Sequence, residues 1–524
     1  MFCQLETLRH AVQPDVRGVL EKLPKTLDET YERILEDITE NNREQACRLF
    51  HCLSVAVRPL RIEELAEILS FDFDEAHGAI PTFRRPDDQI DAVLSACSSL
   101  IAIVNDEDSR VVQFSHLSVK EFLTSNHLAS SSGDLSRYHI LPKAAHTIFA
   151  QICLGSLLHV DHHVDDESES SKSLLLANYA AQHWVTHAQF EDVASSVEDG
   201  MRSLFDADKP HFSAWVRTYD MDRESDGTSQ SEKPNPLYYA ALCGFQDLAK
   251  HLAIKHPQHV NAIGGFYEFP LAAALRGEHL QIAEVLLEHG GTVDVRGRAG
   301  ETVLHKIILL NEENIDAVQF LLEHGADVNA QREDLSTPLH LATVVRDLNV
   351  TRILLEHNAD VNSQNDQGLA PLHLLTRPEI SLLEEEDSDH AVLLLRGGAN
   401  ASLQTKDHST PLHLASYNQR FEVVQVLFDH GANADAENDE GRTPLQEFFR
   451  VDHPAHDDHA GVARVLLERG AEAYGREKYH VTTSDLAVCF EKKFLSLFGD
   501  NNGPENSRDQ TAIHQWLKGD SYCS

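Results

Sequence analysis

Two groups of histidines and aspartates are the parts of this 524-residue sequence whose residue types could bind a metal ion. The groups are His159, His162 and His163 with Asp165 and Asp166, and His453, His456 and His459 with Asp457 and Asp458. Neither provides a satisfactory helical i, i+4 histidine pair with a separate third ligand, as a zinc site would. Both fall in expected loops, and a chain with 32 histidines produces such groups by chance. We therefore expect no metal site.

The sequence lacks the motifs of nucleotide hydrolysis and of serine or cysteine catalysis. No G-x-x-x-x-G-K-S/T phosphate-binding loop occurs, and no G-x-S-x-G turn presents a serine. The eight cysteines are scattered without C-x-x-C pairs, which argues against a zinc site and a disulfide framework. We expect no catalytic residue, no cofactor and a reducing compartment, so the chain is predicted not to be an enzyme.

The net charge and the hydropathy of the sequence argue against two classes of binding partner, nucleic acids and membranes. With 84 acidic and 44 basic residues the net charge is −40, and such a surface repels phosphate backbones. No run of about 18 apolar residues exists, and Arg9, Asp15 and Arg17 interrupt the region where a signal peptide would be apolar. We expect no nucleic acid or membrane partner and a cytoplasmic location, with the nucleus as the open alternative.

One short phrase recurs six times in the C-terminal half. Its complete form is Thr-Pro-Leu-His, and the copies begin at Phe269, Thr302, Thr337, Ala370, Thr410 and Thr443. Their second positions are 33, 35, 33, 40 and 33 residues apart, close to the ankyrin period. A second phrase follows about 20 residues later, for example Leu-Leu-Glu-His-Gly-Ala-Asp-Val-Asn at 321–329. The double motif resembles the ankyrin family over about residues 235–490.

Each phrase contains residues that begin or end a helix of such a repeat. Threonine caps a helix, proline fits its first turn, and the leucine begins an apolar stripe. The second helix should end at a residue that tolerates left-handed geometry: Gly290, Gly325, Asn358, Gly398, Gly431 or Gly470. A degenerate first repeat is expected to start at Pro236, and a degenerate last repeat is expected from Thr482 to Leu497. The acidic insertion at Glu384 to Asp389 and a second one from Val451 to Gly461 should lengthen loops.

Hairpin tips and first-helix faces are the expected protein-binding surface of the repeats. The tip candidates are Arg332, Asp334, Asn365, Asp366, Lys406, His408, Asn438 and Asp439. The inner-helix candidates are Arg346, Arg377, Tyr417, Arg420 and Arg450. Each of them has the alternative of being a solvated residue that binds nothing. The recurring His305, His340 and His373 are expected to be structural, inside the stack at the helix starts.

The N-terminal region is predicted to be helices followed by one hairpin. Helices are expected from Leu23 to about Thr39, Arg43 to Val57, Arg61 to Leu69, and Ile90 to Ser98. Strands at 100–104 and 111–114 should flank a turn, and Ser118 with Glu121 should form the capping box of the next helix. This order suggests a winged helix. Its acidic face and wing tip argue against DNA binding.

Three phrases in this region resemble the segment that follows the NACHT nucleotide-binding core in fungal NOD-like receptors, which are signal-transducing (STAND) NTPases. They lie at Cys3–Arg9, Leu23–Leu35 and Phe114–Leu123. The resemblance covers about residues 1–160. It implies that His116 approaches nucleotide phosphates, with a structural role at the wing-to-helix junction as the equal alternative. Because no phosphate-binding loop occurs, the chain is expected to be a shortened member or to need a separate NACHT partner.

The expected fold is mainly α, a helical and winged-helix region followed by an ankyrin α-solenoid. The predicted segments are the end of a NACHT-like core at 1–16, the winged helix at 17–130, a helical linker at 131–233, the repeats at 234–498 and a tail at 499–524. The resemblance implies a protein-binding sensor, the regulatory half of a NOD-like signalling receptor, with self-association through a NACHT-containing form. The alternatives are part of a nucleotide-switch ATPase whose core is missing, or a stand-alone ankyrin adaptor.

Overall fold

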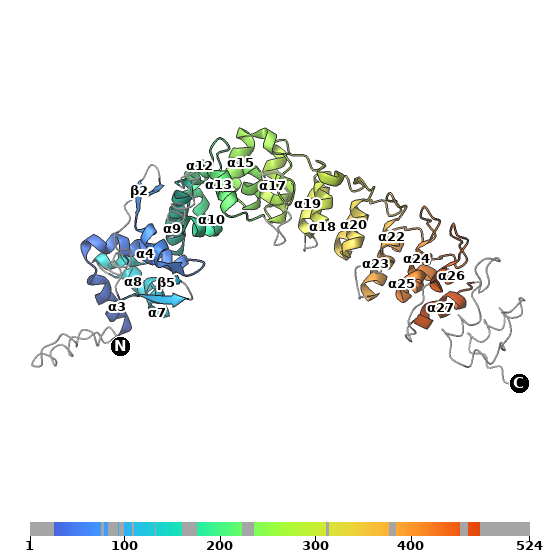
Figure 1. Ribbon diagram of the computed structural model, residues 1–524, viewed down its shortest axis with the longest axis horizontal. Helices are drawn as coiled ribbons and strands as arrows, with labels where there is room; N and C mark the ends of the chain where they lie inside the picture. The colour runs from blue at the N-terminus through green and yellow to red at the C-terminus, as the bar shows by residue number, and fades with distance from the viewer. Residues whose placement is uncertain are drawn as a thin grey trace, which may run out of the picture. The chain divides into compact units, whose positions relative to one another are not determined.

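The computed structural model describes most of the chain between residues 26 and 471 (Figure 1). The described ranges are 26–74, 78–81, residue 93, 99–106, 109–131, 133–159, 175–222, 235–310, 314–376, 384–450 and 459–471. Several expected features lie outside them: the segment 1–16, most of the helix 90–98, Arg377, the degenerate last repeat 482–497 and the tail 499–524. The chain divides into two compact units, Met1–Phe266 and Tyr267–Ser524.

The first unit begins with three helices close to their expected positions. They are Leu27–Glu36 (α3), Arg43–Val55 (α4) and Ile62–Ile68 (α5), with the short 3₁₀ turn Glu40–Asn42 (η1) between the first two. Helix α3 starts where the hydroxyl of Thr26 accepts the Glu29 N–H at 3.1 Å, satisfying one of the free amide groups of the first turn. Pro59 separates α4 from α5 because proline disfavours helical geometry in the residue before it.

The wing is a three-stranded antiparallel sheet. The expected hairpin is present as Ile101–Asp106 (β4) and Ser109–Phe114 (β5). A third strand that we did not expect, Leu60–Arg61 (β1), pairs with the other edge of β5, giving the order β1-β5-β4. A separate hairpin of Phe71–Asp74 (β2) and Gly78–Pro81 (β3) was also not predicted. Two-residue strands and short hairpins carry too little alternation to be recognised from sequence.

The helix after the wing starts two residues earlier than expected and with a different cap. It spans Leu117–Leu123 (α7), and its N-cap is His116, whose Nδ1 accepts the Ser118 N–H at 3.2 Å. The predicted Ser118 capping box is therefore wrong. The Ser118 hydroxyl instead lies 2.7 Å from the Tyr31 hydroxyl, so it links α7 to α3. Helix Asn126–Ser130 (α8) and the 3₁₀ turn Gly133–Tyr138 (η2) follow.

The region expected to be a linker contains a packed helical bundle in its described part. Its helices are Pro142–Leu158 (α9), Leu175–Ala188 (α10), Val193–Ser196 (α11), Glu198–Leu204 (α12) and His211–Thr218 (α13). Helices α9 and α10 pack side by side (Figure 1). Trp184 and Trp215 are fully buried with ring centroids 5.4 Å apart, and Trp215 donates to the Ala181 carbonyl at 3.0 Å. Aromatic burial of this extent makes a core rather than a flexible tether.

The first ankyrin-type helix pair belongs to this same unit. It consists of Pro236–Leu242 (α14) and Gln246–Lys255 (α15), followed by the 3₁₀ turn Pro257–His259 (η4). Phe245 stacks on Trp184 with centroids 5.4 Å apart, and Tyr239 contacts Trp215 edge-on at 5.6 Å. The aromatic core therefore continues from the helical bundle into the first repeat.

The second unit is a series of helix pairs joined by hairpins. The pairs are Pro270–Arg276 (α16) with Leu280–Glu288 (α17), Val303–Leu309 (α18) with Ile315–Glu323 (α19), Pro338–Val345 (α20) with Leu348–Glu356 (α21), Pro371–Leu374 (α22) with Glu384–Arg396 (α23), Pro411–Tyr417 (α24) with Phe421–Asp429 (α25), and Pro444–Phe448 (α26) with His459–Glu468 (α27). A 3₁₀ turn, Arg298–Gly300 (η5), lies in one hairpin. All six predicted left-handed positions after the second helices have positive φ, from 65° at Asn358 to 101° at Gly470.

The acidic insertion departs from expectation. Glu384 to Asp389 do not lengthen a loop but form the first turns of α23. Within them Asp387 is fully buried. Acidic side chains are favoured at helix N-termini, which explains why this stretch can be helical in spite of its charge.

Candidate protein-binding surface

The hairpin tips of successive repeats are joined by backbone hydrogen bonds. The Glu333 N–H donates to the Ala299 carbonyl at 2.9 Å, Asp366 N–H to Asp334 at 2.8 Å, and Asp439 N–H to Asp407 at 3.0 Å. At the base of the hairpins the Asp-Val-Asn residues form a second series, in which the Asn329 side chain accepts the Asp360 N–H at 2.7 Å and the Asn362 side chain accepts the Asn400 N–H at 2.8 Å. These bonds fix the spacing at which the tips present their side chains.

The repeated histidine links each repeat to the hairpin of the next. His340 is fully buried, its Nδ1 accepts the Thr337 N–H at 3.1 Å, and its Nε2 donates to the Leu369 carbonyl at 3.0 Å. His305, His373 and His413 repeat this arrangement toward Ser336, Leu403 and Arg442. These contacts agree with the expected structural role, since both ring nitrogens are used within the stack.

Burial lowers the pKa of these histidines. The pKa of His305 and of His373 falls to about 4, and the pKa of His340 and of His413 is also below its usual value. The neutral form is favoured because a charge inside the stack would lose its hydration. In addition, a proton on Nδ1 would remove the acceptor of the helix-cap bond.

In two repeats that lack the histidine, an acidic side chain makes the contact to the next hairpin instead. The sequence analysis did not predict these acidic residues. In the first repeat Tyr238 occupies the histidine position, and its hydroxyl donates to Asp222 at 2.7 Å. The other oxygen of Asp222 accepts the Phe266 N–H at 2.7 Å. In the repeat beginning at Phe269, the buried Glu268 accepts the Arg298 N–H at 3.1 Å. Burial raises the pKa of Glu268. The absence of the histidine from these two repeats is the sequence signal that could have indicated another side chain in its place.

The predicted tip residues divide into two kinds. Asn365 and Asn438 accept backbone N–H groups of their own hairpins, from Leu369 at 2.9 Å and from Arg442 at 3.0 Å. Asp334 likewise accepts the Ser336 N–H at 3.0 Å, and Arg332 pairs with Glu301 at 3.3 Å. These four side chains stabilise the hairpins that carry them.

The other tip residues are exposed. Asp366, Lys406, His408 and Asp439 face solvent, and His408 pairs with Asp439 of the next tip. Neither member of this pair is buried, so the pair contributes little to stability. Their side chains are therefore available to a ligand without loss of the fold.

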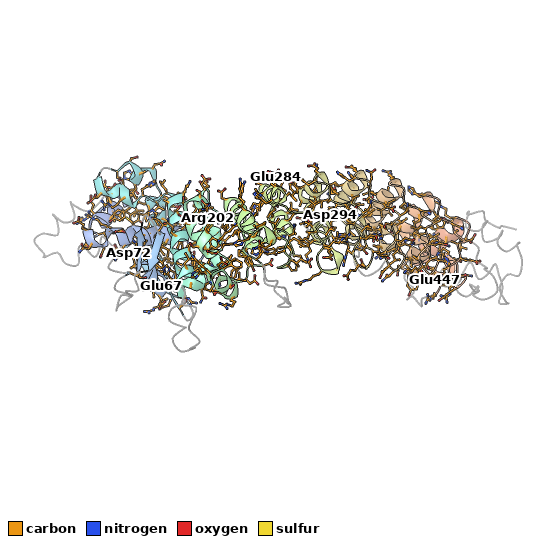
Figure 2. The ribbon with its side chains drawn as sticks, turned by 90° about the horizontal axis from the view of Figure 1, so that it is seen from above. Glu67, Asp72, Arg202, Glu284, Asp294 and Glu447 are labelled. Carbon is orange, nitrogen blue, oxygen red and sulfur yellow. The ribbon has the colours of Figure 1, made fainter. Side chains whose placement is uncertain are left out.

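An aromatic and cationic patch lies at the ends of two first helices. Tyr417, at the end of α24, is 38% exposed, and the guanidinium of Arg450 lies 5.9 Å from the centre of its ring. Arg450 also pairs with Glu447 at 3.4 Å (Glu447 is labelled in Figure 2). Tyrosine and arginine with large accessible surfaces are the residue types that most often dominate protein–protein binding.

Arg346 and Arg420 do not belong to the exposed surface, contrary to our expectation. Their side chains are only 10% and 7% exposed, and both pair with the buried carboxylate of Asp387, at 2.5 Å and 3.7 Å. Arg346 holds the left-handed position between α20 and α21 with φ of 61°. The sequence did not reveal this cluster because its carboxylate comes from the insertion, which repeat alignment treats as an extra loop.

His116 is exposed at the start of α7, and its Nδ1 lies 2.7 Å from the Ser118 hydroxyl. Its nitrogen is thus used at the wing-to-helix junction, while its predicted approach to nucleotide phosphates stays a prediction. His159 contacts the Gly155 carbonyl at 2.8 Å. In the described part of the chain no three His, Cys, Asp or Glu residues form a group that could hold a metal ion. The remaining residues of the two histidine groups lie outside that part or are described only in backbone.

No helix in the described ranges combines the length and apolarity that crossing a bilayer requires.

Comparison with known proteins identifies both kinds of domain. Residues 237–332 and 381–477 match the family described as ankyrin repeats (3 copies), and 314–375 match ankyrin repeats (many copies). Residues 10–133 match the family described as GPI inositol-deacylase, winged helix domain. The chain is therefore mainly helical, with ankyrin repeats and an N-terminal winged-helix domain, as the sequence predicted.

Two curated relatives cover part of the chain. The azaphilone pigments biosynthesis cluster protein L of Monascus ruber is 33% identical over 310 residues, which are 55% of this chain and 64% of that protein. An ankyrin repeat protein of Fowlpox virus is 26% identical over 133 residues, 25% of this chain and 29% of that protein. The chain thus spans less than two thirds of either relative. Among solved structures, the ankyrin repeat domain of Bcl-3 matches 41% of this chain and 94% of its own length with 24% identity and a TM-score of 0.35.

Proposed function

We propose that the chain is a protein-binding scaffold and that it acts as the regulatory and ligand-recognition half of a NOD-like signalling receptor. The ligand is a protein, held by the exposed tips at Asp366, Lys406, His408 and Asp439 together with Tyr417 and Arg450. The proposal rests on one observation above all: hydrogen bonds join neighbouring hairpins while these side chains remain exposed. The bonds are backbone ones from Asp366 to Asp334 and from Asp439 to Asp407, and one from the Gln364 side chain to the Gln404 carbonyl. A pre-organised surface loses little conformational entropy on binding.

The receptor context is supported by domain order. A winged helix precedes a helical bundle and ankyrin repeats, which is the order that the resemblance to NACHT-containing receptors implies. In this proposal His116 contacts nucleotide phosphates only when a NACHT core is joined or bound, and self-association occurs through that form. The chain by itself has no catalytic activity and works in the cytoplasm, with the nucleus as the alternative.

A nucleotide titration separates the scaffold from a nucleotide switch. We expect the purified chain to bind neither ADP nor ATP, because its sequence contains no G-x-x-x-x-G-K-S/T phosphate-binding loop. Tight binding of either nucleotide would reverse the proposal that the chain is not an enzyme. Loss of that binding in His116→Ala would then assign the residue to the nucleotide.

The tip surface can be tested by charge reversal. Asp366→Lys combined with Lys406→Glu alters two exposed tips and preserves the net charge. Asp199→Lys combined with Lys209→Glu makes the same exchange at exposed positions of the helical bundle and serves as the control. Proteins cross-linked to the wild-type chain in extracts of the source cells should also be captured by the control and lost from the tip variant. Equal capture by all three chains would rule out the tips as the recognition surface.

A further inference from the structure

A polar pocket in the first unit lies where the winged helix meets the helical bundle. Its volume is about 440 Å³, and it is lined by Arg58, Pro59, Arg61, Glu64, Ser109, Val111, Asn178 and Gln182. The walls come from the α4–α5 connection with β1, from β5, and from one face of α10. Pockets that bind small ligands begin at about 300 Å³, so this one is large enough for a compact molecule or one long side chain.

The charged side chains that line the pocket are Arg58, Arg61 and Glu64. Glu64 is almost fully buried and is held by Arg58 through two hydrogen bonds of 2.6 and 2.9 Å. This pair also explains why the pKa of Arg58 is raised. The neighbouring Glu63 pairs with Arg110 at 3.5 Å. Arg61 is exposed, and none of the acidic side chains that the structure describes pairs with its guanidinium. A positive site is unusual on a chain of net charge −40.

The backbone of Arg61 and the guanidinium of Arg58 are both held in place by contacts within the protein. The Arg61 N–H donates to Glu64 at 2.8 Å, and Arg61 pairs with Val111 in the sheet. The guanidinium of Arg58 lies 4.9 Å from the centre of the Tyr179 ring. Asn178 and Gln182 stand one turn apart on the exposed face of α10, and their amides make no hydrogen bond within the described residues. The pocket thus presents the Arg61 guanidinium and the side-chain amides of Asn178 and Gln182, and hydrogen bonds hold the Arg61 backbone in place.

We infer that this pocket binds a carboxylate that carries further hydroxyl or amide groups. A guanidinium matches the planar carboxylate through two parallel hydrogen bonds. The amides can donate to the carboxylate or accept from the groups beside it. A doubly charged phosphate fits less well, because Arg58 is already paired with Glu64 and only the Arg61 guanidinium is left to face it. The inference is independent of the ankyrin surface, because every lining residue belongs to the first unit.

The test is a ligand-observed NMR titration of the full chain with two carboxylate probes. Gluconate represents a free hydroxy acid, and a capped Gly-Ser-Glu-Ser-Gly peptide represents a side chain of a protein partner. Sorbitol, which lacks the carboxylate, should not bind. Saturation by gluconate would indicate a free acid as the source, and saturation by the peptide alone would indicate a protein.

Arg61→Gln should weaken binding of the active probe by roughly tenfold or more, as expected for loss of a charge-assisted hydrogen bond. Arg217→Gln, which removes an exposed charge from α13, should leave the affinity unchanged. Asn178→Leu with Gln182→Leu should also weaken binding while leaving the positive charge in place. The inference is overturned if neither probe binds, or if Arg61→Gln binds as tightly as the wild type.

Discussion

Asp387 connects three repeats through one buried carboxylate. It pairs with Arg346 from the preceding repeat and with Arg420 from the following one, and all three side chains are at least 90% buried. Near it the fully buried His390 contacts the Thr351 hydroxyl at 3.0 Å. A carboxylate shared by two buried cations is hard to replace, because its loss leaves both charges without compensation.

Replacement of this carboxylate gives the first prediction. Asp387→Asn should lower the free energy of unfolding of the ankyrin repeats by about 3 to 5 kcal/mol, the usual cost of breaking a buried ion pair from one side. Urea denaturation followed by circular dichroism measures it. Asp389→Asn removes the same charge at an exposed position of the same helix and should change stability by less than about 0.5 kcal/mol. Equal stability of the two variants would show that Asp387 does not carry the cluster.

The buried histidines give a pH prediction. Their folded pKa values lie below the unfolded value of about 6.5, at about 4 for His305 and His373. The unfolded chain therefore takes up protons that the folded chain does not, and stability falls as the pH is lowered from about 6.5 toward 4. Above pH 6.5 the stabilisation is complete. Each histidine contributes a slope of at most about 1.4 kcal/mol per pH unit.

The repeat that begins at Thr443 supplies the control for this pH effect. Gln446 occupies the histidine position there, and its side-chain oxygen accepts the Thr443 N–H at 2.9 Å. His373→Gln should therefore keep the helix-cap bond but remove one titrating group. Urea midpoints between pH 4 and 8 should depend less steeply on pH in this variant than in the wild type. An unchanged slope would mean that His373 does not titrate with unfolding.

At the scale of the element, six first helices, α14, α16, α18, α20, α22 and α24, are tied to the next hairpin by a polar side chain. The tie is a histidine in four repeats, Tyr238 with Asp222 in the first, and Glu268 in the second. Tyr238→Phe should lower the melting temperature of the first unit, because a net hydrogen bond contributes about 1 kcal/mol and an aspartate acceptor more. Tyr417→Phe, on the exposed side, should not. Identical melting curves for both variants would contradict the proposed tie.

Much of this organisation could be predicted from local sequence. The repeating phrases predicted the helix pairs, the left-handed ends and the structural histidines because the copies share the same turn geometry at the ends of their second helices, although the residue before the first helix varies from Thr337 to Phe269 and Ala370. The strand β1 and the burial of Arg346 and Arg420 could not be predicted. Each depends on a partner from another part of the chain that no period marks, such as Val112 for Leu60 or Asp387 for Arg346.

At the scale of the whole molecule, the chain contains two compact units, to which we propose different tasks. The first combines the winged helix, the helical bundle and the first repeat, and it carries His116 and the proposed carboxylate pocket. The second carries the tips and the patch of Tyr417 and Arg450. We therefore expect ligand recognition and receptor regulation to be separable by mutation.

Mutation of the patch of Tyr417 and Arg450 tests whether ligand recognition can be separated from receptor regulation. Tyr417→Ala with Arg450→Ala should weaken binding of the protein ligand by roughly thirtyfold or more, which corresponds to about 2 to 4 kcal/mol for two central contacts. Surface plasmon resonance with a ligand identified by cross-linking measures the change. Leu117→Ala with Lys120→Ala, two exposed positions of the winged helix, should leave the affinity unaltered. If only the winged-helix variant lost affinity, the ligand would bind the first unit.

The most direct measurement of the central proposal is hydrogen–deuterium exchange of the full chain with and without that protein ligand. The account predicts slower exchange in the tip segments 404–409 and 437–442 and at the end of α24, with the winged helix unchanged. Slower exchange confined to residues 26–222, with the tips unaffected, would contradict it.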